Sequence, residues 1–227
     1  MVDIYVIGIG YKPLDSMERK ILYRSEIILS SERLLQVFKR YREFKKVEER
    51  VVVLNTVDET IEFIRSRTDK KSGENPVTVL ASGDPLFFGI GRRILSEFGK
   101  ERVEIMPDLS SIQVAFSRIK EPWDNAFLMS LHRGPDPKRR RNLKYEMKDI
   151  PSLLERHKKL AILTDRESNP SEIARVLISS NVSQPTIFVC EKLGDPDERI
   201  IKGTPEDIVA MSFSTPNVAI ILSGEEG

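Results

Sequence analysis

Two short glycine-containing segments combine residue types that suit a small polar ligand. The segment Gly8-Ile9-Gly10 follows the apolar run Ile4 to Ile7, and the segment Ser82-Gly83-Asp84 follows the apolar run Val77 to Leu80. Glycine lets the main chain approach a ligand closely, and an aspartate offers acceptor oxygens. Because Asp84 would repel a phosphate group, the second segment suits a cationic or hydroxyl-bearing ligand.

Both segments also have purely structural interpretations, which the residue types leave open. Asp84 can cap a helix that begins at Pro85, because proline is well suited to a first helical turn. The Gly8-Ile9-Gly10 segment can be an ordinary glycine turn. A dinucleotide fingerprint is excluded because Pro13 stands where that motif needs its third glycine, so a dehydrogenase is disfavoured.

Polar residues at two later strand ends supply further candidates. Ser110 and Ser111 follow the run Val103 to Met106 and can donate hydrogen bonds to a ligand, although Ser110 can equally cap a helix. His132 follows the run Phe127 to Ser130. We consider it a candidate general base, with a structural histidine as the alternative interpretation.

A run of four basic residues, Lys138 to Arg141, lies between these candidates and the C-terminal third of the chain. The formal net charge is only +1, so we expect no nucleic-acid partner. Such a run is usually a solvated loop. Because guanidinium groups pair well with carboxylates, a small polycarboxylate is the alternative we consider as its partner.

The composition of the 227-residue chain, with 40% hydrophobic and 31% charged residues, is typical of a soluble globular protein. Cys190 is the only cysteine, which excludes an intramolecular disulfide and a thiolate zinc cluster. Two histidines make a histidine metal site improbable on composition, and we expect no metal. No apolar run reaches membrane-spanning length and the N-terminus lacks a basic start, so we expect a cytoplasmic protein without membrane contact.

Apolar runs of strand length alternate with amphipathic segments, which predicts an α/β fold with two α/β domains, residues 1–108 and 109–227. We expect a mostly parallel sheet in the first domain, a mixed sheet in the second, and a ligand cleft between them at the carboxyl ends of the strands. The predicted strands are 4–7, 27–29, 51–54, 77–80, 103–106, 127–130, 160–164, 186–190, 199–202 and 218–222. The predicted helices are 16–24 with Ser16 as N-cap, 56–67, 85–98, 110–119, 150–157 and 170–179.

In this order, the segments Gly8 to Leu29, Ser82 to Pro85 and Ser110-Ser111 resemble the tetrapyrrole methylase family. The resemblance covers nearly the whole chain. The segments Ser82 to Gly91, Pro107 to Gln113, Pro122-Trp123 and Ser130-Leu131-His132 together are similar to the branch that methylates C5 of a corrin precursor.

Two departures from the family pattern stand out. The family often has G-x-G-P-G-D in its first loop, whereas this chain continues from Gly10 with Tyr11-Lys12-Pro13. Arg133 also follows His132 where a glycine is expected.

The resemblance implies S-adenosylmethionine as methyl donor, a homodimer, and methylation at C5 of a cobalt-containing polycarboxylate corrin in cobalamin biosynthesis. It implies a possible partner protein that methylates C15 and decarboxylates, because this branch resembles one half of fused enzymes. His132 would remove the proton. The implied cofactor-binding residues are Ile9, Gly10, Ser82, Gly83, Asp84, Phe87, Ser110, Ser111, Leu131 and Thr164.

Two alternatives remain open from the sequence. The first keeps the fold and the methyl donor but acts on another tetrapyrrole carbon or on a diphthamide precursor. The second is a non-catalytic nucleotide-binding regulatory module, which tight binding of S-adenosylmethionine without any methyl acceptor would favour.

Overall fold

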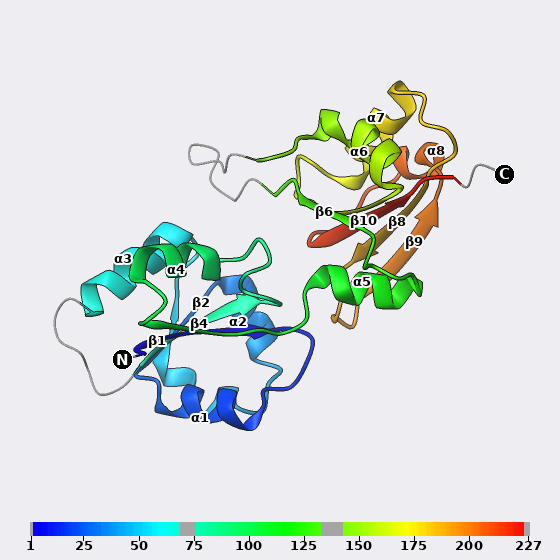
Figure 1. Cartoon of the computed structure of the whole chain (residues 1–227). Helices are drawn as coiled ribbons and strands as arrows, with labels where there is room; N and C mark the ends of the chain where they lie inside the picture. Colours follow the sequence, from blue (N-terminus) through cyan, green and yellow to red (C-terminus); the bar gives the residue numbers. More distant parts are fainter. Residues whose placement is uncertain (1, 69–75, 133–142, 225–227) are drawn as a thin grey trace. The chain divides into compact units, whose positions relative to one another are not determined.

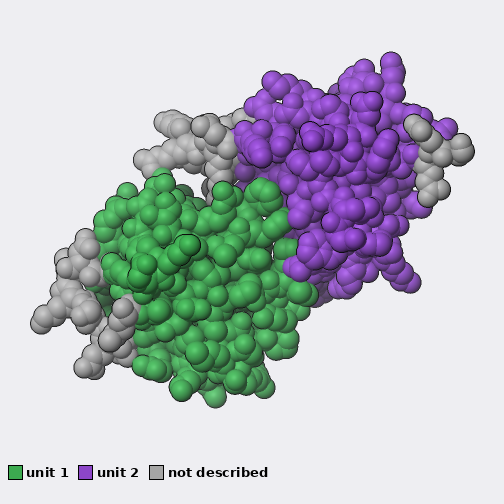
Figure 2. Space-filling view, viewed as in Figure 1, with its two compact units in different colours: residues 1–110 green, residues 111–227 purple. Residues whose placement is uncertain are grey.

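The computed structural model describes residues 2–68, 76–132 and 143–224 (Figure 1). The chain divides into two compact units, residues 1–110 (unit 1) and residues 111–227 (unit 2), which Figure 2 colours separately. Each unit holds one five-stranded sheet with its own helices, which confirms the predicted α/β class. No helix in the described parts of the chain is long and apolar enough to span a bilayer.

The sheet of unit 1 is entirely parallel, with the strand order β3-β2-β4-β1-β5. Parallel strands need crossover connections, and the amphipathic segments between the apolar runs supply them as helices. The central strand pair is β1 with β4, in which Ile4 lies opposite Val77 and Ile9 opposite Ser82. The strands are β1 (Ile4–Ile9), β2 (Ile27–Ser30), β3 (Val51–Val53), β4 (Val77–Ser82) and β5 (Val103–Met106).

Helices cover both faces of this sheet. Residues of α3 and α4 pack against Ile4, Val6 and Val79 on one face. Residues of α1 and α2 pack against Ile7 and Leu80 on the other. The elements are α1 (Ser16–Arg24), α2 (Glu32–Phe38), α3 (Val57–Thr68) and α4 (Gly91–Phe98), with short 3-10 turns η1 (Phe44–Lys46) and η2 (Glu48–Arg50).

Three local predictions in unit 1 were wrong. The helix expected from Pro85 begins only at Gly91, because the chain turns back so that the Gly91 N–H donates to the Pro85 carbonyl, and Phe88 has a φ of 55°. The N-cap of α1 is Asp15 rather than Ser16, since the Asp15 carboxylate accepts the Glu18 N–H in a capping box.

The third correction concerns Gly8, which we expected in a turn. It lies inside β1, paired with Ala81 of β4, because the strand continues to Ile9. The turn therefore starts at Gly10, whose φ of 133° is one that side-chain-bearing residues rarely adopt.

Unit 2 contains a mixed sheet with the order β6-β7-β10-β8-β9, in which only the β6–β7 pair is parallel. The last strand thus lies in the middle of the sheet, and the predicted strands 186–190 and 199–202 pair with each other as the antiparallel hairpin β8–β9. One face packs on α6, α7 and α8 around Leu154, Ile173 and Ile208, while α5 contacts β7 and β10. The elements are α5 (Ser111–Ile119), β6 (Phe127–Ser130), η3 (Met147–Asp149), α6 (Ile150–His157), β7 (Lys159–Leu163), α7 (Pro170–Ser179), β8 (Thr186–Glu191), β9 (Arg199–Gly203), α8 (Pro205–Val209) and β10 (Asn217–Leu222).

Candidate functional site

The candidate site of unit 1 is built at the carboxyl ends of β4, β1 and β5, which are neighbours in the sheet. Seven of the residues predicted to bind the cofactor follow or end these strands. Ligands of open parallel sheets bind at this edge. The structure therefore groups on one edge Ile9, Gly10, Ser82, Gly83, Asp84, Phe87 and Ser110.

Two glycines let these strand ends pack main chain against main chain. A Cβ atom on Gly8 would lie 2.0 Å from the Gly83 carbonyl oxygen and 2.5 Å from the Asp108 nitrogen. Gly83 has a φ of 60°, and a Cβ atom there would lie 2.7 Å from the Leu109 carbonyl oxygen. No side chain fits at either position, because both glycines are buried against neighbouring main chain. At Gly10, by contrast, a Cβ atom would meet nothing within 4 Å, so the main chain there borders open space that a ligand can enter.

Asp84 shapes the turn after β4. One of its carboxylate oxygens, Oδ1, accepts the Leu86 N–H at 2.8 Å, and its carbonyl accepts the Phe87 N–H at 3.2 Å. The Asp84 side chain therefore closes a local turn with the residue two positions later. It does not cap α4, which begins at Gly91. The other oxygen of this half-buried side chain, Oδ2, has no hydrogen-bond partner within the described residues.

An aromatic pair follows the turn. The rings of Phe87 and Phe88 meet edge to face, with their centroids 4.8 Å apart and their planes at 82°. Both side chains are half-buried. They add an apolar surface beside the polar turn, which is the combination that most small-molecule sites use.

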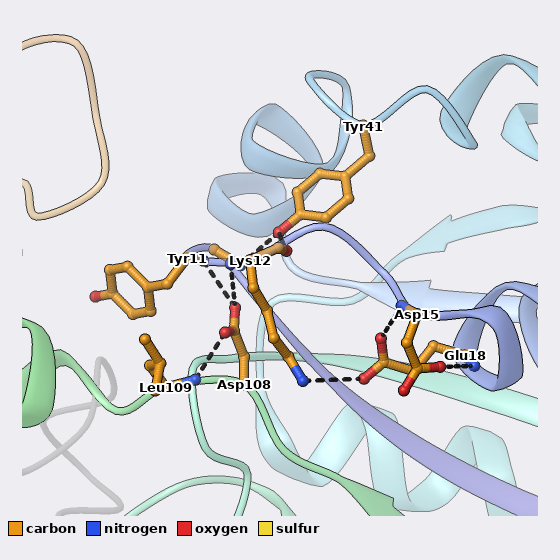
Figure 3. A network of polar contacts seen from close by, with 8 residues as sticks. Tyr11, Lys12, Asp15, Glu18, Tyr41, Asp108 and Leu109 are labelled. Atoms are coloured by element: carbon orange, nitrogen blue, oxygen red, sulfur yellow. Dashed lines mark hydrogen bonds and ion pairs between the residues drawn. The ribbon is translucent and has the colours of Figure 1, made fainter.

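A buried carboxylate ties the strand ends together. Asp108 is 5% exposed and follows β5 by two residues. Its Oδ2 accepts the Tyr11 N–H at 2.7 Å and its Oδ1 accepts the Leu109 N–H at 2.7 Å. Figure 3 marks these contacts with dashed lines. Oδ2 also accepts the Lys12 N–H at 3.3 Å. Asp108 thereby links the loop after β1 to the loop after β5.

Tyr41, from the turn after α2, completes this network (Figure 3). Its hydroxyl accepts the Gly10 N–H at 2.8 Å and donates to the Lys12 carbonyl at 3.0 Å. Burial raises the pKa of the Tyr41 hydroxyl, and the negative charges of Asp108, Glu18 and Glu43 raise it further against the opposing effect of the Gly10 hydrogen bond. The hydroxyl therefore stays protonated and able to donate.

The serine pair lies at the boundary between the units. Ser110 is 6% exposed and is the last residue of unit 1, and Ser111 is the first residue of both unit 2 and α5. Ser110 thus occupies the position that precedes a helix, where a side chain can meet free main-chain N–H groups.

The remaining predicted residues lie in unit 2, where β6 and β7 end side by side. The Leu131 side chain is 1% exposed within the core of the unit, and its N–H donates to the Leu163 carbonyl at 2.8 Å. The Thr164 hydroxyl donates to the Asn217 carbonyl at 3.0 Å. His132 is exposed, and its N–H donates to the Ser130 hydroxyl at 3.2 Å. Because the Leu131 side chain lies in the core of unit 2, a ligand could reach only the main chain of this residue.

Two other expectations fall on residues that the structure does not describe. Arg133 and the basic run Lys138 to Arg141 lie outside the described residues. Within the described ranges, no three His, Cys, Asp or Glu side chains are grouped so that they could hold a metal ion.

Sequence reasoning missed two residues of the unit 1 network. Tyr41 gave no signal, because nothing in its neighbourhood links it to a loop 31 residues earlier. Asp108 did carry a signal, since it follows a predicted strand at the same edge as the glycine turns. We interpreted that segment only through its serines.

The sequence model of the family described as Tetrapyrrole (Corrin/Porphyrin) Methylases matches residues 3–209. The chain belongs to the tetrapyrrole methylase family.

Among curated relatives of this tetrapyrrole methylase, one from Methanocaldococcus jannaschii is named probable cobalt-precorrin-7 C(5)-methyltransferase. It is 28% identical over 98% of this chain and 99% of its own length. Cobalt-precorrin-7 C(5)-methyltransferase of Salmonella typhimurium is 34% identical over 62% of this chain and 61% of its own length. A Sinorhizobium precorrin-6Y C(5,15)-methyltransferase [decarboxylating] is 32% identical over 56% of this chain, which spans 28% of that longer protein.

Solved structures share the fold. Precorrin-6Y methylase of Archaeoglobus fulgidus superposes with a TM-score of 0.66 at 23% identity, covering 99% of this chain and 98% of that one. Uroporphyrin-III C-methyltransferase of Thermus thermophilus, solved with S-adenosyl homocysteine, gives 0.67 at 16% identity, covering 96% and 91%. At these identities the likeness establishes the tetrapyrrole methylase fold.

Proposed function

We propose that this chain transfers a methyl group from S-adenosylmethionine to C5 of cobalt-precorrin-7, a step of cobalamin biosynthesis. The observation that carries the proposal is the match to the Methanocaldococcus jannaschii relative, which spans 98% of this chain and 99% of that protein. The Salmonella typhimurium relative, whose name gives the same reaction, supports it.

The unit 1 edge has the chemistry that S-adenosylmethionine requires. That molecule carries a sulfonium, an ammonium and ribose hydroxyls, all of which suit carboxylate and carbonyl acceptors. Oδ2 of Asp84, which has no hydrogen-bond partner among the described residues, is such an acceptor. The space beside Gly10, where a Cβ atom would meet nothing within 4 Å, leaves room for the ligand. Phe87 offers an apolar surface beside them.

We assign cofactor contacts within each unit by this chemistry. In unit 1, Ile9, Gly10, Ser82, Gly83, Asp84, Phe87 and Ser110 would bind the adenosyl and methionine portions. In unit 2, Ser111, Thr164 and the main chain of Leu131 would contribute. The Thr164 hydroxyl already donates its hydrogen to Asn217, so it can only accept a hydrogen bond from the cofactor.

The reaction needs alignment more than acid–base groups. Bound S-adenosylmethionine supplies an electrophilic methyl group, and C5 of the electron-rich macrocycle is the nucleophile. The protein's part is to hold the two reacting atoms in line and to exclude water, which can account for much of the rate. After transfer a proton must leave the ring. The exposed His132 is the base we propose for it.

The finer parts of the proposal concern partners and location. We propose a homodimer in the cytoplasm. We also propose a separate C15-methylating, decarboxylating partner, because the longer Sinorhizobium relative carries both activities in its name and this chain matches only part of it. The basic run 138–141 would meet the carboxylates of the corrin.

Calorimetry with S-adenosylhomocysteine, followed by a methyl-transfer assay with cobalt-precorrin-7, tests the proposal. We expect saturable binding that is lost in Asp84→Ala, and one methyl group added at C5. Asp124→Ala, an exposed aspartate in unit 2, is the matched control and should bind normally. No binding of the cofactor product by the wild type would overturn the proposal.

The assay also separates the alternatives. Methylation of a different tetrapyrrole or of a diphthamide precursor, with cobalt-precorrin-7 left unchanged, would replace the substrate and keep the chemistry. Tight binding without any methyl acceptor would favour a regulatory module.

A further inference from the structure

We propose that Asp108 and Tyr41 are positioning residues that set the shape of the first loop, residues 10–12, for cofactor binding. The inference rests on the proposed function and extends it to two residues that need not touch the cofactor. Their carboxylate and hydroxyl hold the main chain between them, as Figure 3 shows.

The main-chain groups of the first loop bind to side chains. The N–H groups of Gly10, Tyr11 and Lys12 each donate to a side chain, that of Tyr41 or of Asp108. The Lys12 carbonyl accepts from Tyr41 as well. These N–H groups are partly buried and their partners are side chains rather than other main chain, so the loop's conformation depends on where the two side chains are held.

The side chains of Asp108 and Tyr41 are themselves held in place. Asp108 is 5% exposed, and its Oδ1 is fixed by the Leu109 N–H. The ring of Tyr41 packs at 6.0 Å from that of Phe38, a fully buried residue of α2. The loop is therefore bound on one side by the residue that follows β5 by two positions and on the other by the turn after α2.

The sequence of the first loop does not fix its conformation locally. Its first loop continues from Gly10 with Tyr11-Lys12-Pro13 and lacks the Pro-Gly-Asp that often follows in the family. Gly10 has a φ of 133°, in a region where glycine has no strong preference of its own. The side chains of Asp108 and Tyr41, which are distant in sequence, hold the loop in place of a local Pro-Gly-Asp turn.

The negative charge of Asp108 strengthens its hydrogen bonds to the loop. Hydrogen bonds to a carboxylate are about twice as strong as neutral ones, so Asp108 dominates the hold on Tyr11 and Lys12. The Lys12 ammonium is directed to Glu18 instead, at 3.5 Å, and Glu18 is in turn held by the Asp15 N–H at 2.7 Å. The loop's side chain and main chain are thus fixed by different carboxylates.

Asp108→Asn and Tyr41→Phe test the proposal, with binding of S-adenosylhomocysteine measured by calorimetry. Asp108→Asn removes the negative charge and leaves one acceptor oxygen where the carboxylate has two, so an NH2 group must face one of the N–H groups now bound. Tyr41→Phe removes the hydroxyl that binds Gly10 and Lys12, and both changes alter side-chain volume little. We expect affinity to fall by about tenfold or more in Asp108→Asn and by less in Tyr41→Phe, because only the first loses a charged acceptor.

Matched controls separate a local effect from a general one. Glu59→Gln alters another carboxylate that accepts two main-chain N–H groups, those of Asn55 at 3.1 Å and Thr56 at 3.0 Å, beside the edge strand β3. Tyr23→Phe removes the hydroxyl of an exposed tyrosine on α1. Both should bind S-adenosylhomocysteine as the wild type does.

Amide hydrogen exchange supplies a readout that does not depend on activity. In the two test variants, the N–H groups of residues 10–12 should exchange faster while those of β1 and β4 keep their protection. In turnover assays the KM for S-adenosylmethionine should rise and the KM for the corrin should not change.

The outcomes distinguish the two proposals. If the wild type does not bind S-adenosylhomocysteine, the proposed function fails. If the wild type binds and both test variants bind equally tightly, the positioning role is wrong. A uniform rise in exchange over the whole of unit 1 would also overturn it, because the two residues would then support the fold rather than the loop.

Discussion

Gly8 lies so close to Gly83 that a Cβ atom on the first would stand 2.0 Å from the carbonyl oxygen of the second. The two residues belong to neighbouring parallel strand ends, β1 and β4, at the edge that carries the candidate site. The contact explains why a glycine sits within a strand, where it is otherwise unfavourable.

We predict that Gly8→Ala lowers both stability and cofactor affinity. A methyl group at this position collides with main-chain atoms rather than with a flexible side chain. The strand ends can make room only by separating, which should lower the free energy of unfolding by about 1–3 kcal/mol or more. Urea unfolding and calorimetry with S-adenosylhomocysteine measure the two effects.

Gly99→Ala is the control for that experiment. Gly99 ends α4 with a φ of 81°, and its nearest contact for a Cβ is the flexible Glu101 side chain at 3.1 Å. The change strains the backbone by about 1–3 kcal/mol, away from the site, and should leave affinity intact. Equal losses of affinity in the two variants would show that the Gly8 contact has no particular bearing on the site.

A second prediction concerns His132. If it removes the proton after methyl transfer, His132→Gln should lower kcat by about 100-fold or more while leaving the affinity for S-adenosylhomocysteine unchanged. His157→Gln makes the same change at the only other histidine, which stacks on Phe127 with ring centroids 4.5 Å apart. Full turnover in His132→Gln would remove the base role and leave His132 as a surface residue.

The sequence predicted the elements well where the signal was local. Apolar runs such as Val103 to Met106 became strands with the expected bounds, and the helix Ser16 to Arg24 was confirmed because its amphipathic pattern and first-turn residues agree. The helix from Pro85 failed because tight packing around Gly89 and Gly91, where a Cβ would meet the Pro85 carbonyl at 2.4 and 2.8 Å, decides the path of the chain.

The site was predicted only in part, for the same reason. The glycine turns and the serine pair are local patterns that follow strands, and the structure brings those of unit 1 to one edge. The contact of Asp108 with Tyr11 spans 97 residues of sequence, and that of Tyr41 with Gly10 spans 31. No periodicity encodes such pairs, because they depend on strand order and on how a turn after α2 folds back.

A third prediction uses Cys190, which is fully buried in β8. Burial raises the pKa of its thiol from 9.0 to about 12, with a further contribution from the charge of Glu198. The thiolate is the reactive form, so we expect a thiol reagent to label the native protein only as fast as it unfolds. Labelling rates measured across a urea series test this directly.

The same shift has a consequence for stability at alkaline pH. Because the folded-state pKa lies above the unfolded value, the unfolded chain loses its thiol proton first as pH rises past 9.0. Stability should therefore decline between that value and about 12. Cys190→Ala removes this part of the decline, and rapid labelling of the wild type under native conditions at neutral pH would contradict the burial on which it rests.

The last prediction concerns the ion pair between Arg118 on α5 and Glu198 in the turn between β8 and β9, within unit 2. The Arg118 hydrogen bond lowers the pKa of Glu198 most, burial opposes it, and the Gly194 N–H at 2.8 Å lowers it further. A carboxyl group with a depressed folded-state pKa stabilises the protein above its unfolded value of 4.5, and that contribution is lost as pH falls through the folded pKa.

Glu198→Gln should therefore destabilise unit 2 at neutral pH and approach the wild type in acid. Since the Arg118 side chain is 46% exposed, solvent screens the pair, and we expect a loss of only about 0.5–1 kcal/mol in the free energy of unfolding. Arg175→Gln removes the guanidinium of another surface ion pair, with Glu172 on α7, and serves as the comparison. A double-mutant cycle of Arg118→Gln and Glu198→Gln isolates the coupling between the two. A coupling free energy of zero at neutral pH would mean that the Gly194 hydrogen bond alone holds Glu198 in the turn.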